Sequence, residues 1–257
     1  MPILLAGALC AVVSGCGGKE SSRQEGQLPD TLRVAAEISP MTLDISGDSL
    51  SGYSYELLEL ICRQHGLPFT IEAFNTLEEA EEASADRHYH VFFTNSPVTV
   101  QLKDSFIVTE PLYTDRQVLV QNSSVDKDSL IRTQQDLANR SVWIPRSSPV
   151  AERLRNLSEE MGAPIDIIEL DSLSEELLVI KIALGEVPRG AVSKMTVEPM
   201  TARYPQLDIS TDLSFSQFKS WLLNPADSML LDSLNNWLAQ CKNTEAYHKL
   251  AKKYNIR

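Results

Sequence analysis

The chain has 257 residues, of which 43% are hydrophobic and 23% are charged, and its formal net charge at pH 7 is -12. This length fits one large domain or two smaller lobes, and the composition is that of a soluble globular protein. The acidity argues against nucleic-acid binding, because phosphate neutralisation needs clustered Lys and Arg. We therefore expect a monomeric globular protein that does not bind nucleic acid.

The first residues have the pattern of a secretory signal. The apolar run Ile3–Val13 is too short to span a bilayer as a helix, and small residues separate it from Cys16. Ser14-Gly15-Cys16 resembles a lipoprotein cleavage site, although no Lys or Arg precedes the apolar run. A buried N-terminal strand is the alternative. We predict a signal peptide over residues 1–15 and a lipidated Cys16 that anchors the protein to a membrane, on the periplasmic side of the cell envelope.

The segment after Cys16 is polar and rich in Gly and Ser, which predicts a flexible tether over residues 16–29. If Cys16 carries a lipid, Cys62 and Cys241 remain as an even pair in an oxidising compartment. They form either a disulfide or two buried free thiols, and the sequence favours neither.

Predicted strands and helices alternate in the first part of the folded chain. Strands are indicated by β-favouring, alternating residues, and helices by apolar residues at helical spacing. In chain order we expect a strand at 31–36, a helix at 55–66, a strand at 68–73, an acidic helix at 77–85 and a strand at 90–94. Gly66 is a suitable C-terminal stop for its helix. The alternation favours a parallel sheet with crossover helices.

The rest of the chain repeats this alternation. The expected elements are a strand at 118–120, a short helix at 133–138, a strand at 142–144, a helix at 148–161, a strand at 165–168, a helix at 173–184, strands at 190–193 and 219–223, and helices at 227–242 and 244–254. Pro149 suits the first turn of its helix, where a missing N–H costs nothing. Thr244 with Glu245 behind it is typical of a helix start.

Several segments, in this order, resemble the family 3 periplasmic solute-binding proteins. They are Leu32-Arg33-Val34 with Gly52–Leu57, Thr109–Tyr113 with Val118–Val120, Asp136–Val142 with the Ser147-Ser148 turn, and the closing run Ala246–Tyr254. The likeness covers nearly the whole chain after Asp30. The chain is also similar to the non-catalytic N-terminal domain of membrane-bound lytic transglycosylase F, through the turn Arg203–Leu207 and Trp221. We expect that the catalytic domain of that enzyme is missing here.

The resemblance implies an α/β fold of the periplasmic binding protein type II-like kind. Two lobes would be joined by two crossing strands, with an inter-lobe cleft for the ligand. We expect lobe 1 to comprise residues 30–115 and 220–257, and lobe 2 to comprise residues 116–219. In such folds the cleft lies at the carboxyl ends of parallel strands, where helix N-termini point inward.

In the amino-acid binders of this family, a Thr-x-x-Arg motif clamps the α-carboxylate of the ligand. The matching residues are Thr99-Val100-Gln101-Leu102, so that Leu102 stands where the arginine would be. An apolar side chain cannot replace a bidentate guanidinium. The family also tends to place an Asp near Ser193-Lys194 for the amino group, and the sequence has no acid there. The resemblance therefore predicts a small-molecule ligand other than a free α-amino acid.

Nine residues are candidates for the ligand site: Met41, Tyr53, Thr94, Asn95, Ser96, Arg146, Ser147, Ser148 and Ser193. Thr94 to Ser96 follow a predicted strand at its carboxyl end, whereas Ser147 and Ser148 precede a helix. Most of them have a purely structural alternative: Asn95-Ser96 is part of a turn signal, Ser147 and Ser148 form an ordinary helix cap, Arg146 is a solvated side chain, and Tyr53 and Met41 are core residues.

We expect neither an enzyme nor a cofactor. No Gly-x-Ser-x-Gly elbow, His-Glu-x-x-His helix or phosphate-binding glycine loop occurs. His88 and His90 have a spacing that a metal could use, but the sequence offers no third ligand, so no metal site is predicted. The first functional hypothesis is a receptor that delivers its ligand to an ABC-type permease. The alternative is an envelope sensor or a non-catalytic peptidoglycan-fragment binder.

Overall fold

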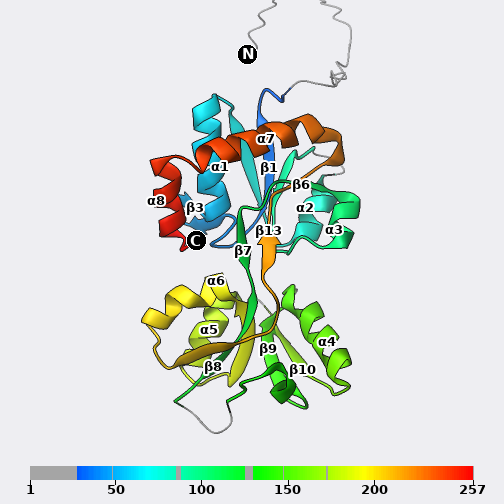
Figure 1. The fold of residues 1–257 in the computed structure, drawn as a ribbon, viewed down its shortest axis with the longest axis vertical. Helices are drawn as coiled ribbons and strands as arrows, with labels where there is room; N and C mark the ends of the chain where they lie inside the picture. The colour runs from blue at the N-terminus through cyan, green and yellow to red at the C-terminus, as the bar shows by residue number, and fades with distance from the viewer. Residues whose placement is uncertain are drawn as a thin grey trace, which may run out of the picture.

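The computed structural model describes residues 28–47, 49–84, 88–124, 130–146, 148–171 and 173–256. Two five-stranded sheets with their helices form two lobes, and two crossing strands connect them (Figure 1). The expected two-lobed α/β architecture is thus confirmed. The predicted signal peptide, Cys16 and most of the predicted tether lie outside the described residues, and so does Ser147.

Lobe 1 is built on a sheet with the strand order β4-β1-β5-β14-β6. Its strands are β1 (Leu32–Glu37), β4 (Phe69–Phe74), β5 (Val91–Phe93), β6 (Ile107–Val108) and β14 (Leu222–Leu223). The first three are parallel, but β14 is antiparallel to both β5 and β6. The expectation of a parallel sheet is therefore wrong at this edge, because the chain returns from lobe 2 through β14.

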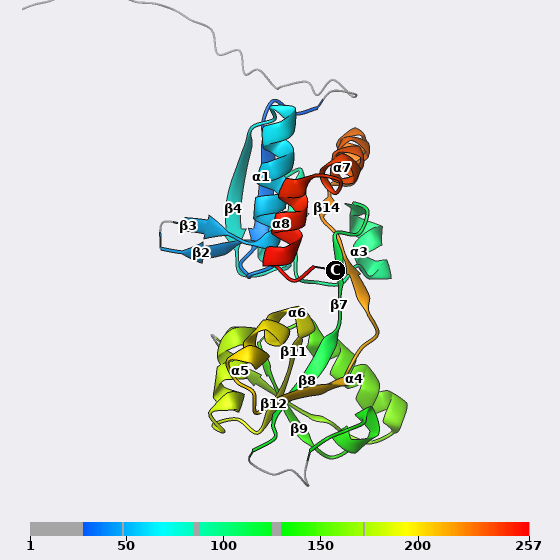
Figure 2. The ribbon, with the colours of Figure 1, turned by 60° about the vertical axis from the view of Figure 1, so that its left-hand side comes forward.

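Helices cover both faces of this sheet. They are α1 (Tyr53–His65), α2 (Leu77–Ala83), α3 (Val100–Ser105), α7 (Ser228–Cys241) and α8 (Glu245–Lys253). Alternating residues of β1 divide between the two cores: Val34 packs with α1, α7 and α8, whereas Ala35 packs with α2 and α3 (Figure 2). Cys62 and Cys241 both lie in the first of these cores as free thiols. The alternative of two buried thiols is therefore the one seen in the structure.

Lobe 2 has the strand order β10-β9-β11-β8-β12. Its strands are β8 (Gln117–Asn122), β9 (Ser141–Pro145), β10 (Asp166–Leu170), β11 (Arg189–Ser193) and β12 (Leu207–Asp212). Its helices are α4 (Val150–Met161), α5 (Glu175–Ala183) and α6 (Lys194–Val197), with the 3-10 turns η1 (Gln134–Leu137) and η2 (Glu198–Ala202). Strand β8 is antiparallel to both β11 and β12, so this sheet is also mixed.

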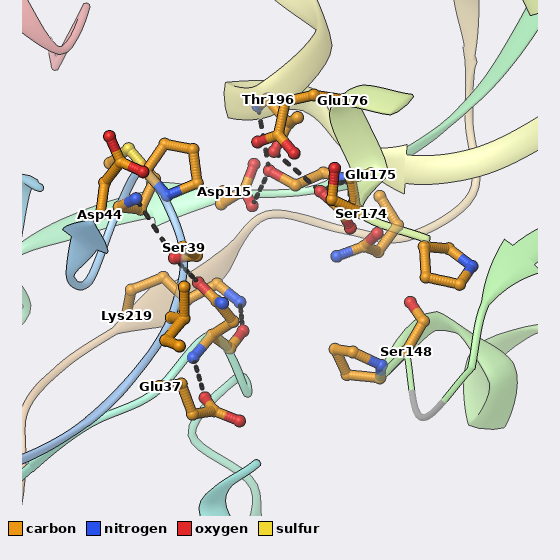
Figure 3. Close-up of a pocket in the computed structure, with 18 of the residues that line it drawn as sticks. Glu37, Ser39, Asp44, Asp115, Ser148, Ser174, Glu175, Glu176, Thr196 and Lys219 are labelled. Carbon is orange, nitrogen blue, oxygen red and sulfur yellow. Dashed lines mark hydrogen bonds between the residues drawn. The ribbon is translucent and has the colours of Figure 1, made fainter. Parts of the chain in front are cut away.

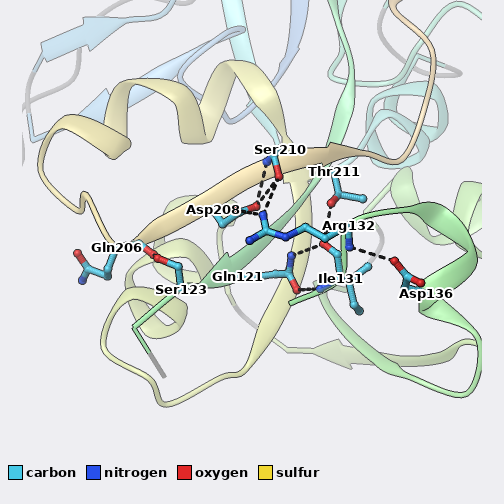
Figure 4. Close-up of polar contacts among 9 residues, drawn as sticks. All are labelled: Gln121, Ser123, Ile131, Arg132, Asp136, Gln206, Asp208, Ser210 and Thr211. Atoms are coloured by element: carbon cyan, nitrogen blue, oxygen red, sulfur yellow. Dashed lines mark hydrogen bonds and ion pairs between the residues drawn. The ribbon is translucent and has the colours of Figure 1, made fainter. Parts of the chain in front are cut away.

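Polar contacts hold the outer part of lobe 2 against β8 and β12 (Figure 4). Gln121 exchanges two hydrogen bonds with the backbone of Ile131, at 2.9 and 2.8 Å. Thr211 donates to the same Ile131 carbonyl at 2.8 Å, and Arg132 Nη1 lies 2.6 Å from Asp208 Oδ2. These bonds tie the segment that precedes η1 to both strands. The expected helix at 133–138 is this short 3-10 turn.

The two lobes are connected by β7 (Tyr113–Asp115) and β13 (Gln217–Lys219), which pair antiparallel with Thr114 opposite Phe218 (Figure 1). The single strand expected at 219–223 is divided: Lys219 ends β13, whereas Leu222 and Leu223 form β14. The lobe boundaries predicted at residues 115 and 220 fall at these crossing strands.

The loop before α1 is held by the first turn of that helix. The N–H groups of Tyr53, Ser54 and Tyr55 donate to the carbonyls of Pro40, Met41 and Thr42, at 3.3, 3.1 and 3.1 Å. These donors have no partner within a helix, so the loop satisfies them. The close approach depends on Gly52, whose φ is 118° and whose Cβ, if it had one, would lie 2.6 Å from the carbonyl oxygen of Thr42.

We therefore expect Gly52→Ala to destabilise the protein by about 3 kcal/mol, because both the φ value and the contact with Thr42 oppose a side chain. Gly66→Ala is the matched control: Gly66 also has a positive φ, of 65°, but open space surrounds its Cβ position. It should cost only about 1 kcal/mol. Urea unfolding of both variants measures the difference, and equal losses would contradict the role assigned to the Thr42 contact.

Candidate functional site

A cleft of about 470 Å³ lies between the lobes. Small-molecule sites commonly have volumes of about 300 to 1,000 Å³. Both lobes and both crossing strands contribute to its walls. Lobe 1 supplies Glu37, Ile38, Ser39, Pro40, Met41, Asp44, Asn75 and Asn95; the crossing strands supply Tyr113, Asp115 and Lys219; and lobe 2 supplies Gln117, Pro145, Ser148, Pro149, Ser174, Glu175, Glu176, Ser193 and Thr196.

The lobe 1 wall is organised by Glu37, the last residue of β1. Its carboxylate accepts hydrogen bonds from the backbone N–H of Asn95 at 2.5 Å and of Leu77 at 3.0 Å. Burial raises the pKa of Glu37, while its bonds with Thr94, Asn95 and Leu77 and the charge of Lys219 act in the opposite direction. Glu37 thus fixes the turn after β5 to the end of β1.

Lys219 approaches the same wall from β13. Its Nζ donates to the backbone carbonyl of Asn95. Burial lowers the pKa of Lys219, and the nearby carboxylates of Asp115, Glu175 and Glu37 partly offset that shift. The side chain of Asn95 is also held, because its Oδ1 accepts a hydrogen bond from Ser39 Oγ at 3.0 Å. The lobe 1 wall is therefore a connected polar network (Figure 3).

The lobe 2 wall contains a second network, centred on Ser193 at the end of β11 (Figure 3). Ser193 Oγ donates to Asp115 Oδ2 at 2.7 Å, and the Ser193 N–H lies 3.2 Å from Glu175 Oε1. Thr196 Oγ1 donates to Glu175 Oε2 at 2.7 Å. The two carboxylates therefore meet at one serine, with Glu175 contributed by the first turn of α5.

This environment changes the acidity of Glu175. The pKa of Glu175 is raised to about 7: burial is the largest cause, the neighbouring charges of Asp115 and Glu176 act in the same direction, and the bonds from Thr196 and Ser193 partly offset them. Glu175 is consequently a carboxyl group that titrates near neutral pH inside the cleft.

Two further residues of the cleft carry buried polar atoms without a hydrogen-bond partner among the described residues. They are Gln117 Oε1 and Ser148 Oγ. Gln117 is 5% exposed and Ser148 is 9% exposed, so water has little access to either. A buried polar atom without a partner is costly, and a ligand could supply the missing bond.

A second cavity of about 500 Å³ adjoins the first, and Ser148 and Pro149 line both. It lies between α3 and α4, and its walls include Ser96 and Thr99 from lobe 1 and Glu152 and Arg155 from lobe 2. Leu102 also lines this cavity. Leu102, which the resemblance places at the position of the family's arginine, therefore faces the space between the lobes.

The structure describes eight of the nine sequence candidates, all except Ser147, and they lie in different places. Met41, Asn95, Ser148 and Ser193 line the cleft, and Ser96 lines the adjoining cavity. Thr94 is buried behind the wall, where it bonds to Glu37.

Two candidates lie elsewhere. Tyr53 is fully buried in the lobe 1 core, because the first turn of α1 directs it inward against Tyr113 and Tyr254, at ring-centroid distances of 5.5 and 5.7 Å. Arg146 is turned to solvent, where its Nε lies 2.5 Å from Asp171 Oδ1. Neither residue is among those that line the cleft. Tyr53 is instead a core residue and Arg146 a solvated side chain, as the structural alternatives for these two residues predict.

Six charged residues of the cleft were not recognised from the sequence: Glu37, Asp44, Asp115, Glu175, Glu176 and Lys219. The sequence has no acid next to Ser193, and the expectation that none lies near it is wrong. The fold brings Asp115 and Glu175 to it, and both form hydrogen bonds with it. The crossing strand β7 and the first turn of α5 bring them there. The available signals were weak: Asp115 follows the family-like run Thr109–Tyr113, and Glu175 follows the helix cap Ser174.

His88 and His90 both make polar contacts within lobe 1. His88 Nε2 lies 3.1 Å from Asp227 Oδ2, and His90 Nδ1 accepts a hydrogen bond from the Arg33 N–H at 2.9 Å. Within the described ranges, no group of three or more His, Cys, Asp or Glu side chains is arranged to hold a metal ion. Also within these ranges, no helix combines the length and the apolarity that crossing a membrane requires.

Comparisons with known proteins identify the fold and the family. Residues 32–256 match the profile of the bacterial extracellular solute-binding proteins, family 3. Among solved structures, an ancestral arginine-binding protein bound to arginine superposes with a TM-score of 0.71 at 18% identity, covering 89% of this chain and 99% of that one. A protein of glutathione import in Streptococcus mutans superposes with a TM-score of 0.73 at 15% identity, covering 88% and 95%. The neighbours share the periplasmic binding protein type II fold.

Curated relatives are of two kinds. Membrane-bound lytic murein transglycosylase F of Shewanella loihica is 23% identical over 88% of this chain, but the match covers 48% of that protein. The chain thus spans about half the length of these relatives. The arginine-binding extracellular protein ArtP of Bacillus subtilis is 21% identical, over 98% of this chain and 96% of its own length.

The raised pKa of Glu175 predicts a pH-dependent stability. The ordinary pKa of Glu175 is 4.5 and its pKa in the folded protein is about 7. Between these two pH values, the folded protein therefore holds a proton that the unfolded chain has lost. The stabilisation from this group is complete below pH 4.5 and is lost as the pH rises through 7. Glu175→Gln should remove this loss, so that the stability difference between about pH 5 and about pH 8 becomes smaller than in the parent protein.

Urea unfolding at several pH values measures this effect. Glu159→Gln, on the exposed side of α4, is the matched control and should keep the parent pH dependence. An unaltered slope in Glu175→Gln would show that Glu175 titrates normally in the folded protein.

Proposed function

Because the chain belongs to the bacterial extracellular solute-binding proteins of family 3, we propose that it captures a small solute between its lobes and delivers it to an ABC-type transporter. The cleft of about 470 Å³, lined by both lobes and both crossing strands, is the observation that carries this proposal. A ligand that contacts both walls stabilises the closed arrangement over the open one, and that difference is what a permease can recognise.

The proposed ligand is not a free α-amino acid. Leu102 lines the inter-lobe space where the resemblance places the arginine clamp of the amino-acid binders. An apolar side chain can neither donate a hydrogen bond to a carboxylate nor balance its charge. The cationic side chain that does reach the cleft, Lys219, is engaged by the Asn95 carbonyl. We therefore propose that neither Leu102 nor Lys219 takes the place of the carboxylate clamp.

We also propose that the protein is held at the cell envelope and acts as a binding protein. The family is extracytoplasmic and consists of binding proteins, and we propose that a lipid on Cys16 holds this member at the cell envelope as a monomer, after removal of a signal peptide over residues 1–15. The lytic transglycosylases among the relatives extend well beyond the matched region. We propose no enzymatic activity for the residues that correspond to it.

A second candidate function is an envelope sensor or a non-catalytic binder of peptidoglycan fragments. The match to several lytic murein transglycosylases F, over 88% to 98% of this chain, favours it. With this second function, the cleft would bind a soluble muropeptide.

A solute-binding function predicts a saturable thermal shift. A ligand at one hundred times its Kd stabilises the folded state by about 2.7 kcal/mol, which raises the Tm by several degrees at this chain length. A library of solutes and soluble muropeptides should contain at least one such compound, and a muropeptide as the sole hit would favour the second candidate. Glu176→Trp, which places a ring in the cleft, should reduce the shift, whereas Glu159→Trp should preserve it. A library without any hit would count against both candidates.

Lipid anchoring predicts that Cys16→Ser releases the protein from membranes. The parent protein should sediment with the membrane fraction and incorporate labelled fatty acid, because an acylated N-terminal cysteine inserts its chains into the bilayer. Ser22→Ala, a change in the predicted tether, should leave both properties intact. Sedimentation of Cys16→Ser with the membranes, at the level of the parent protein, would disprove the anchor.

A further inference from the structure

We propose that the cleft selects a small organic cation that carries an ammonium or guanidinium group and no α-carboxylate. This inference rests on the proposed function and specifies the chemical class of its ligand.

The charges of the cleft are unbalanced. Five acidic side chains line it, those of Glu37, Asp44, Asp115, Glu175 and Glu176, and among the described lining residues Lys219 is the one Lys or Arg. Lys219 donates to the Asn95 carbonyl and lies near Asp115, Glu175 and Glu37, so a single positive charge is shared among several acidic side chains. A cationic guest would reduce the repulsion among the remaining carboxylates, whereas an anionic guest would add to it.

The carboxylates occupy both walls, which suits a guest that reaches across. Figure 3 shows Asp115, Glu175 and Glu176 grouped on the side of α5 and α6, with Asp44 and Glu37 on the lobe 1 side. Asp115 and Glu175 are held by Ser193 and Thr196, so their positions are fixed before a ligand arrives. A preorganised acceptor pair binds a charged N–H group more strongly than a mobile one.

An independent observation also favours an N–H donor. Gln117 Oε1 is buried and accepts no hydrogen bond from any described residue, although Gln117, at 5% exposure, belongs to the wall of the cleft. The hydroxyl of Ser148, at 9% exposure, also has no partner among the described residues, but it can both donate and accept and so does not discriminate between a cation and a carboxylate. A carboxylate guest cannot donate to Gln117 Oε1, but an ammonium or a guanidinium can.

The remaining lining fits the carbon chain of such a guest. Pro40 and Met41 on lobe 1 face the cleft together with Pro145 and Pro149 on lobe 2. These apolar groups can cover methylene groups between polar ends. The cleft therefore combines acceptors for N–H groups with apolar surface, and Lys219, the one Lys or Arg among its described lining residues, already donates to the Asn95 carbonyl.

The test is titration calorimetry of the purified protein with compounds of one chain length that differ in charge. 1,4-Diaminobutane and agmatine supply amine and guanidine groups, 1,4-butanediol is the neutral control, and adipate is the anionic control. We expect saturable binding of at least one cation, and at least about tenfold weaker binding of the diol and adipate. Arginine, which adds an α-carboxylate to the cation of agmatine, should bind at least about tenfold more weakly than agmatine.

Variants assign the binding to the cleft. Glu176→Gln removes one cleft carboxylate that lies outside the hydrogen-bond networks of Glu37 and Ser193 described above, and it should weaken cation binding by about tenfold. Glu159→Gln changes the net charge equally on the exposed side of α4 and should leave the affinity unchanged. Equal affinities in the two variants would place the cations on the surface and overturn the inference.

The other outcomes separate this inference from the proposed function. If adipate or the diol binds more tightly than both cations, the charge class is wrong, and if arginine does, the exclusion of an α-carboxylate is wrong; in each case a solute-binding function stands. Saturable binding of Ca²⁺ without any binding of the organic cations would also overturn the inference, in favour of a metal. If no compound of this panel binds but the wider library yields a saturable ligand, the inference again fails alone. If the library also yields none, the proposed function fails with it.

Discussion

The antiparallel pair of β7 and β13 is the constraint on which the site depends. Each of these short strands carries one charged residue into the space between the lobes: Asp115 on β7 and Lys219 on β13. Their register places Lys219 opposite Tyr113, and Asp115 opposite Gln217. Lys219 therefore joins the network around Glu37 and Asn95, whereas Asp115 joins the network around Ser193 and Glu175. The connection between the lobes is at the same time a part of both walls.

The local features of this fold were readable from the sequence because they depend on near neighbours. Gly66 ends α1 in a left-handed conformation, as its position after an amphipathic run predicts, and Thr244 caps α8 by accepting from the Tyr247 N–H. The alternation of β1 divides its side chains between two cores. The strand β12 was missed, although it closes the lobe 2 sheet by pairing with β8. Its run Leu207–Asp212 mixes apolar and polar residues, and only its tertiary partner selects the strand.

The site itself could be predicted only in part, because its bonds connect residues that are far apart in the chain. Ser193 and Asp115 are 78 positions apart, Asn95 and Glu37 are 58, and Lys219 and Asn95 are 124. Asn95 and Ser193 could be proposed since each follows or ends a strand at the edge where clefts form. Glu37 and Glu175 gave no comparable signal. A carboxylate at a strand end or in the first turn of a helix is common without any function.

The loop over residues 39–42 links the far end of the chain to the ligand wall. Tyr254, just after α8, accepts a hydrogen bond from the Gly52 N–H at 2.9 Å, and its own hydroxyl donates to Glu56 Oε1 at 2.6 Å. Gly52 in turn packs on the Thr42 carbonyl, and Pro40 and Met41 line the cleft. The Tyr254 phenol thus connects the C-terminal residues to Gly52, and through Gly52 to the loop that lines the cleft. These contacts join the last helix to the wall of the cleft without passing through the crossing strands.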